Sequence, residues 1–73
     1  MIGEPVTIYV ELADEGVDCW RPVKAERVAT DTFRIVDLIP PGERWRFQPG
    51  EVVRCKKRKF SDGMGLAAYE RLN

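Results

Sequence analysis

Short segments in which apolar and polar side chains alternate recur along this chain, and residues that favour turns separate them. The clearest is residues 6–12, where four aliphatic residues alternate with Thr7, Tyr9 and Glu11. A period of two places successive side chains on opposite faces of a β-strand, so one face of this segment is apolar. β-Branched and aromatic residues, which favour strands, fill most of its positions. The pattern predicts an all-β protein.

Four more strands are expected after a turn at residues 13–16. Their predicted ranges are residues 23–28, 33–38, 51–60 and 66–72. Pro22 cannot donate a ladder hydrogen bond, so the second strand is expected to become regular only near Val23. Residues 66–73 also contain good helix formers, but the Asp-Gly turn before them favours a hairpin and therefore a strand.

The longest interruption is residues 39–50, which contain three prolines and two glycines. This composition excludes a helix or a sheet interior and predicts a long surface loop. Trp45 and Phe47 alternate with arginines inside the loop. We therefore expect a short extended stretch there, with the two rings covering an open end of the core.

Strand parity also predicts where the fourth segment and the two cysteines point. Val53 and Cys55 share a parity that Phe60 does not, so a β-bulge must fall within residues 56–59 if all three side chains point inward. Cys19 and Cys55 share parity with neighbouring apolar positions and are expected to pack as small hydrophobic side chains. The alternative is a reactive thiol at Cys55, with a pKa lowered by the surrounding Lys and Arg residues.

The size of the chain limits it to one small core. It has 73 residues, 44% of them hydrophobic, and a formal net charge of zero. A chain of this length buries only about 60% of the surface that its unfolded form exposes, so residues 1–73 are expected to form a single domain. Five short strands are too few for a sandwich and suit a small, strongly bent barrel with one long loop rich in proline and glycine.

Several classes of protein are disfavoured by composition. The sequence contains no histidine and two cysteines, whereas zinc needs about four N or S ligands, so we expect neither a metal nor another cofactor. The absence of histidine removes the commonest general base, and we expect a protein that is not an enzyme; an accessory subunit of an enzyme, built around Cys55, is an alternative. No apolar run is long enough to cross a bilayer and the first residues lack the features of a signal peptide, so a cytoplasmic protein is expected.

Charge is unevenly distributed along the sequence. Residues 1–20 contain five carboxylates and no Lys or Arg, whereas residues 44–59 contain seven cations and one carboxylate. The favoured interpretation is an acidic first strand and a basic fourth strand that neutralise each other across the barrel. The alternative is a basic strand that stays free for an anionic partner.

The order of elements resembles that of a known group of proteins. The sequence GVDCWRPVKAERVATDTFRIVDL follows the Tudor-type pattern of a Trp and Arg entering a strand, a small residue, a polar turn and an aromatic-led return strand. FQPGEVVRC is similar to the PG-x-x-V entry of many such barrels. Over residues 6–70 the chain resembles small bacterial SH3-like proteins of unassigned function. The resemblance implies a five-stranded antiparallel SH3-like barrel that serves as a binding module; the methyl-lysine cage of Tudor domains does not carry over residue by residue.

An exposed surface of aromatic and Arg side chains is the favoured candidate site. Its expected members are Tyr9, Trp20, Arg21, Trp45 and Arg46. Trp20 lies on the parity opposite the predicted core positions of its strand, and aromatic and Arg side chains dominate contact surfaces. The rings also have a structural interpretation, in which Trp20 closes the barrel mouth and the loop folds onto the core. We expect a monomeric adaptor that binds another protein through this surface.

The alternative candidate site is a row of cations. Arg54, Lys56 and Arg58 share one face of the predicted fourth strand and are spaced roughly 7 Å apart, near the spacing of nucleic-acid phosphates. This row predicts an anion-binding surface in a domain associated with nucleic acid. The sequence pI of about 6.2 is low for such a domain. Lys57 and Lys59 have a further interpretation, because lysines on an edge strand discourage aggregation.

Overall fold

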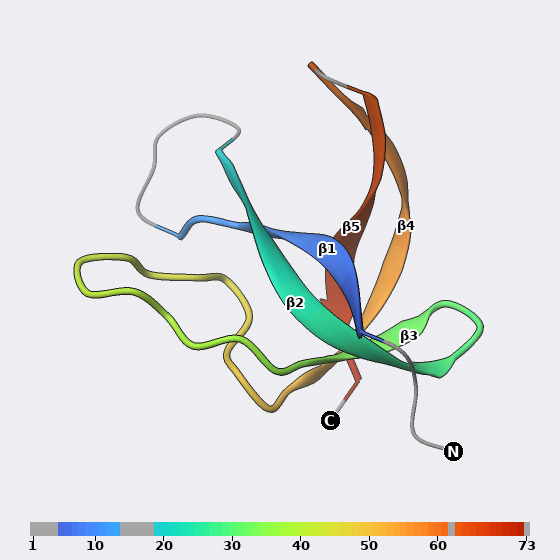
Figure 1. The fold of residues 1–73 in the computed structure, drawn as a ribbon, viewed down its shortest axis with the longest axis horizontal. Coiled ribbons are helices and arrows are strands. Elements are labelled where there is room, and N and C mark those ends of the chain that lie inside the picture. Colours follow the sequence, from blue (N-terminus) through green and yellow to red (C-terminus); the bar gives the residue numbers. More distant parts are fainter. Residues whose placement is uncertain (1–4, 14–18, 62, 73) are drawn as a thin grey trace.

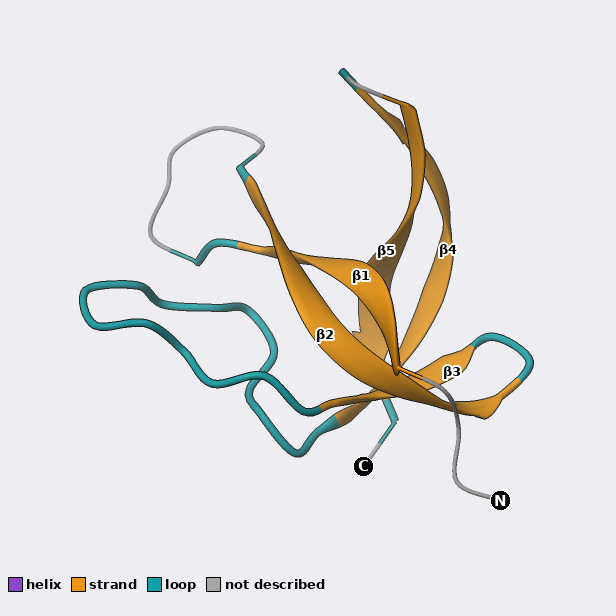
Figure 2. Ribbon diagram, viewed as in Figure 1, coloured by secondary structure: helices purple, strands orange, loops and turns teal. Residues whose placement is uncertain are grey.

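The computed structural model describes residues 5–13, 19–61 and 63–72, which form five β-strands and no helix, and so no helix able to cross a membrane. The strands are β1 (Pro5–Glu11), β2 (Trp20–Ala29), β3 (Thr32–Ile35), β4 (Val52–Phe60) and β5 (Gly63–Arg71). They pair in the order β1-β2-β3-β4-β5, and β5 returns to β1, so the sheet closes into a barrel (Figure 1, Figure 2). The expected all-β, five-stranded barrel of SH3-like size is confirmed.

The predicted antiparallel barrel is present, and within it the pair of strands that closes the barrel is parallel. Each turn reverses the chain direction, so the fifth strand runs in the same sense as the first. β1 and β5 therefore meet in parallel, through the single register pair Tyr9↔Ala67. The four other neighbouring pairs are antiparallel and span three to eight register positions each.

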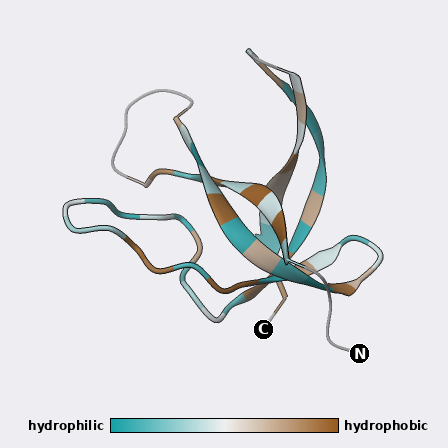
Figure 3. Ribbon diagram, in the orientation of Figure 1, coloured by the Kyte–Doolittle hydropathy of each residue, from teal (hydrophilic) through white to brown (hydrophobic). Residues whose placement is uncertain are grey.

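Alternate residues of the strands fill the barrel interior, as the period of two predicts. Bands of high and low hydropathy follow one another along β1 and β2 (Figure 3). The buried cluster consists of Ile8, Val10, Val23, Ala25, Phe33, Ile35, Trp45, Phe47, Val53, Cys55 and Ala68. Every strand contributes to this cluster, and two members come from the loop between β3 and β4.

β2 begins at Trp20, three residues earlier than predicted. Pro22 lies inside the ladder, opposite Tyr9 of β1. The prediction was wrong because an antiparallel ladder takes a hydrogen bond toward a given neighbour from only every second residue, so one missing N–H does not end the strand. The early start matters for function, because it fixes Trp20 at a defined register position opposite Glu11.

β3 ends at Ile35, three residues before the predicted end. The Val36 N–H still donates to the Lys24 carbonyl at 3.0 Å, but the Asp37 carboxylate then accepts a hydrogen bond from the Lys24 N–H at 3.2 Å. The Asp37 side chain thus replaces a backbone carbonyl as the acceptor for Lys24, and the regular ladder between β2 and β3 ends there. Leu38 beyond it is 78% exposed.

The long loop folds back onto the barrel, as its aromatic residues predicted. Trp45 forms an isolated antiparallel bridge with Leu12, just after β1. The Arg46 N–H donates to the Glu11 carbonyl at 2.9 Å, and the Ala13 N–H donates to the Arg44 carbonyl at 2.7 Å. The rest of the predicted turn at residues 13–16 lies outside the described residues. The bridge aims the Trp45 ring into the core, where it is 3% exposed.

β4 carries its irregularity at Arg54 and Cys55, not within residues 56–59 as predicted. The prediction assumed that Phe60 points inward with Val53 and Cys55. Phe60 instead packs on the outside of the barrel, so the register from Cys55 to the end of β4 needs no further shift. β5 is a strand throughout Gly63–Arg71, which confirms the preference over a helix.

The hairpin of β4 and β5 continues beyond the barrel wall. β3 pairs with β4 only as far as Arg54, whereas β4 pairs with β5 to the end of the strand at Phe60. Figure 1 shows the two strands rising together away from the crossing of β1 and β2. We call the described part of this extension, residues 56–61 and 63–66, the arm.

The Phe33→Ala variant is expected to lose about 3–5 kcal/mol of unfolding free energy, because Phe33 is the largest fully buried side chain and its removal leaves a cavity. That is a large part of the stability of a small domain. Urea titration followed by circular dichroism measures it. Leu38→Ala, at an exposed position, is the control and should stay within about 0.5 kcal/mol of wild type. A loss at Phe33 as small as that of the control would contradict the assigned core.

Candidate binding site

Three aromatic side chains gather outside the barrel, where the arm meets β1 and β2. The rings of Tyr9 and Phe60 are stacked, with centroids 4.3 Å apart and planes inclined by 26°. Trp20 meets Phe60 edge to face, with a centroid distance of 5.7 Å and an angle of 74°. We call Tyr9, Trp20 and Phe60 the aromatic cluster. It links three strands that are distant in sequence and is separate from the barrel core.

Small residues on β5 make room for these rings. Gly63, Gly65 and Ala67 occupy every second position, and their partners across the ladder are Phe60, Arg58 and Lys56. A Cβ atom built on Gly65 would lie 2.6 Å from Cε1 of Tyr9 and 3.1 Å from Cε2 of Phe60. The Tyr9 ring therefore rests directly on the backbone of β5, beside the register pair that closes the barrel.

Cations border the aromatic cluster. The Arg58 guanidinium carbon lies 5.0 Å from the centroid of Trp20 and 5.9 Å from that of Phe60, within the range of cation–π attraction. An open hollow of about 480 Å³ lies beside these groups, and its lining residues are Tyr9, Trp20, Pro22, Arg58, Lys59, Phe60 and Ser61. We call it the aromatic hollow. It combines ring edges and faces with two positive charges.

Among the described residues, the indole N–H of Trp20 has no hydrogen-bond partner, although it is shielded from water. A buried donor without an acceptor costs about 1–3 kcal/mol. Trp20 is half-buried in the aromatic cluster outside the barrel core, and its indole N–H is a polar group that an incoming acceptor would satisfy.

The residues of the predicted aromatic and Arg surface do not lie together in the structure. Tyr9 and Trp20 meet in the aromatic hollow, but Trp45 is a core residue. The Trp45 indole N–H donates to Glu43 at 2.9 Å, and Arg21 forms an ion pair with the same carboxylate, whose side chain is 18% exposed. Arg21 and Trp45 thus serve to hold the loop against the barrel. The Trp45 ring is not part of an exposed surface.

Arg46 lies neither in the aromatic hollow nor at the Glu43 carboxylate. Its guanidinium is 3.4 Å from the Glu11 carboxylate and 5.1 Å from the centroid of Phe47. Arg46 therefore belongs to the contact between the loop and β1. Phe60 and Pro22, which the sequence analysis did not include in the site, line the aromatic hollow, whereas the predicted members Arg21, Trp45 and Arg46 do not. The small residues at alternate positions of β5 leave space for a large ring on the neighbouring strand, but this pattern alone does not show that Phe60 points outward.

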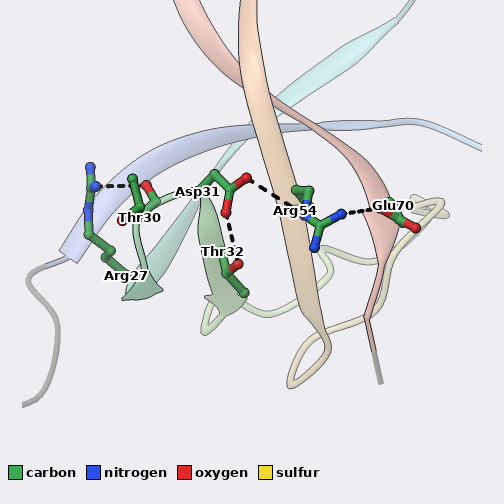
Figure 4. A network of polar contacts seen from close by, with 6 residues as sticks. All are labelled: Arg27, Thr30, Asp31, Thr32, Arg54 and Glu70. Atoms are coloured by element: carbon green, nitrogen blue, oxygen red, sulfur yellow. Dashed lines mark hydrogen bonds and ion pairs between the residues drawn. The ribbon is translucent and has the colours of Figure 1, made fainter.

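The three cations of the predicted row on β4 also have different neighbours and do not form one continuous surface. Arg54 lies between two carboxylates, with Nη1 at 3.0 Å from Glu70 and Nε at 3.7 Å from Asp31 (Figure 4). The Lys56 amine lies 4.9 Å from the Tyr69 centroid, and Arg58 lies over Trp20. The carboxylates that Arg54 meets come from the β2–β3 turn and from β5, so this neutralisation does not involve the acidic residues 1–20.

Cys55 is a core residue whose thiol has a raised pKa. Burial, and secondarily the Asp31 carboxylate, raise the pKa of the Cys55 thiol from 9.0 to about 12. In the alternative interpretation the surrounding Lys and Arg residues lower this pKa, but the Cys55 side chain is 3% exposed and the shift is upward. Cys19 is half-buried. The described residues include no group of three or more His, Cys, Asp and Glu able to hold a metal ion.

Gly65→Ala is expected to lower the free energy of unfolding by about 1–3 kcal/mol, because the new methyl group forces Tyr9 away from Phe60. Urea titration of Gly65→Ala, Tyr9→Ala and the double variant measures the coupling. The cost of the added methyl should largely disappear in the Tyr9→Ala background. An equal cost in both backgrounds would show that the methyl group meets something other than the Tyr9 ring.

Cys55 is expected to resist alkylation at pH 8 in the native protein, while half-buried Cys19 reacts faster. Because the folded protein holds the Cys55 proton more tightly, the stability that this provides is complete below pH 9 and is lost as the pH rises toward 12. The maximum slope is about 1.4 kcal/mol per pH unit. Cys55→Ala should show a shallower decline above pH 9 in urea titrations, and identical slopes would contradict the raised pKa.

Comparison with known proteins finds no relative for this chain. No protein-family model matches it, and no curated protein or solved structure matches it at a significant level. The site assignment therefore depends on the geometry of the chain itself, and the structure establishes a small five-stranded β-barrel.

Proposed function

We propose that this protein is a non-enzymatic binding module that docks a segment of another protein in the aromatic hollow. The observation that supports this is the convergence of Tyr9, Trp20 and Phe60 with Arg58 around one open hollow. Aromatic rings give a large contact area for a small loss of side-chain freedom, and aromatic and Arg residues dominate the energy of protein interfaces. The proposal keeps two of the predicted residues, Tyr9 and Trp20, and moves the surface toward the arm.

The chemistry of the hollow favours an extended segment with apolar side chains and a carboxylate. Apolar groups would lie on the rings and on Pro22, while Arg58 and Lys59 offer positive charge. A backbone carbonyl of the partner would accept a hydrogen bond from the orphan indole N–H of Trp20, once it displaces the groups that cover that atom. The likeness in size and strand number to SH3-like barrels is consistent with such an adaptor role in a bacterial cytoplasm.

A protein partner accounts for this surface better than nucleic acid. Arg54 is engaged by two carboxylates, so the row of three predicted phosphate contacts is incomplete in this fold. In the aromatic cluster, Tyr9 and Phe60 stack on each other and Arg58 lies over Trp20, so these contacts already occupy one face of each ring. Base stacking needs an accessible ring face.

Selection of binders from a library of random 12-residue peptides tests the proposal. Trp20→Ala is expected to weaken the selected peptides by about 30-fold or more, as for a central interface residue of about 2 kcal/mol. Arg58→Gln should weaken mainly the peptides that contain carboxylates. Leu38→Ala is the control, because this exposed residue lies outside the hollow. A folded Trp20→Ala protein that retains all the selected peptides would refute the proposed surface, as would salt-sensitive nucleic-acid binding with no selected peptide.

A further inference from the structure

The arm has two strand edges that no described strand covers. On the β4 side, the ladder with β3 stops at Arg54, before the arm begins. On the β5 side, the only register pair with β1 is Tyr9↔Ala67, which lies just beyond the arm. Backbone N–H and C=O groups on such edges form a ready template for another strand, and proteins usually protect them.

The two edges are protected very differently. Residues 56–59 on β4 are all Lys or Arg and all are exposed, and consecutive cations discourage another strand from pairing there. The described residues 63–66 on β5 are Gly63, Met64, Gly65 and Leu66, with no charge among them. Met64 is 65% exposed. The β5 edge thus lacks the protection that its neighbour has.

A second hollow follows this unprotected edge. It has a volume of about 440 Å³ and is lined by Thr7, Lys57, Met64, Gly65 and Leu66. Gly65 lies under the Tyr9 ring, whereas its neighbours Met64 and Leu66 point to the other face of the strand. Because residues of both faces line the hollow, it runs along the edge of β5 and not over one face.

Lys57 gives this edge its electrostatic character. It lies opposite Leu66 in the ladder, and no described carboxylate lies within ion-pair distance of its amine. Lys59 follows on the same face, opposite Met64. Two cations on the face that carries Met64 and Leu66 favour an incoming strand whose carboxylates lie on that face, with apolar residues at the alternate positions.

We propose that the β5 edge of the arm, residues 63–66, binds an extended acidic segment of a partner protein as an added strand. Main-chain hydrogen bonds to the edge provide affinity, and Lys57 selects a carboxylate on the incoming strand. A second copy of this chain is a poorer occupant, because residues 63–66 of another arm carry no carboxylate that could meet Lys57. This site is separate from the aromatic hollow, and the inference does not depend on the proposed function.

The probe is a blocked heptapeptide that alternates valine and glutamate, with a lysine-containing counterpart of the same pattern. Amide hydrogen exchange and two-dimensional NMR on the full chain report where each peptide binds. We expect the glutamate peptide to protect the amides of residues 63–66 and the lysine peptide to have little effect. Lys57→Glu should weaken the glutamate peptide about tenfold and favour the lysine peptide, with Lys57→Gln intermediate.

Lys56→Glu is the matched control, because it makes the same charge change on the same strand but at the neighbouring position, where the side chain lies over Tyr69. It should leave binding nearly unchanged, and so should Trp20→Ala, which separates this site from the aromatic hollow. The inference fails if no amide of residues 63–66 gains protection, or if Lys56→Glu and Lys57→Glu act equally. It also fails if protection of the β5 edge depends on protein concentration alone, since a second copy would then be the occupant.

Discussion

Closure of the barrel depends on one contact, the meeting of β1 and β5 at Tyr9 and Ala67. Five strands joined by reversals leave the first and last parallel, and a single register pair provides little main-chain bonding. Side chains provide the rest, because the Tyr9 ring lies on the Gly65 backbone and stacks on Phe60. The same contact that closes the barrel thus holds the arm in place and forms one wall of the aromatic hollow.

The arm consequently has two distinct sides. Near the barrel its small β5 residues accept the aromatic cluster, and Arg58 lies over Trp20. At the outer edge of β5 the backbone is uncovered, and Lys57 provides charge. Stability and recognition are therefore linked, since a change at Gly65 affects both the closing contact and the backbone edge beside it. The loop contributes differently, with Glu43 holding Trp45 inside the core.

Much of the fold was predictable because burial follows a period of two. The alternation in β1 and the return of Trp45 and Phe47 onto the core both appear in the structure as expected. The candidate site was predicted less well. Tyr9 and Trp20 are together, but the sequence cannot show that Phe60 leaves the interior, because parity alone does not say which face a strand presents once it extends past the barrel wall.

The amino-acid sequence by itself determined the strand content, the alternation of inward and outward residues in the barrel wall and the restriction to a single small core, since these follow from local periodicity and chain length. Only the tertiary structure decided which exposed side chains meet. Registers across β4 and β5 and the meeting of β1 with β5 place Phe60 beside Tyr9 and Trp20. They also leave residues 63–66 without a described strand on the side opposite β4. Such contacts between distant segments depend on how the sheet bends and closes, which no local pattern encodes.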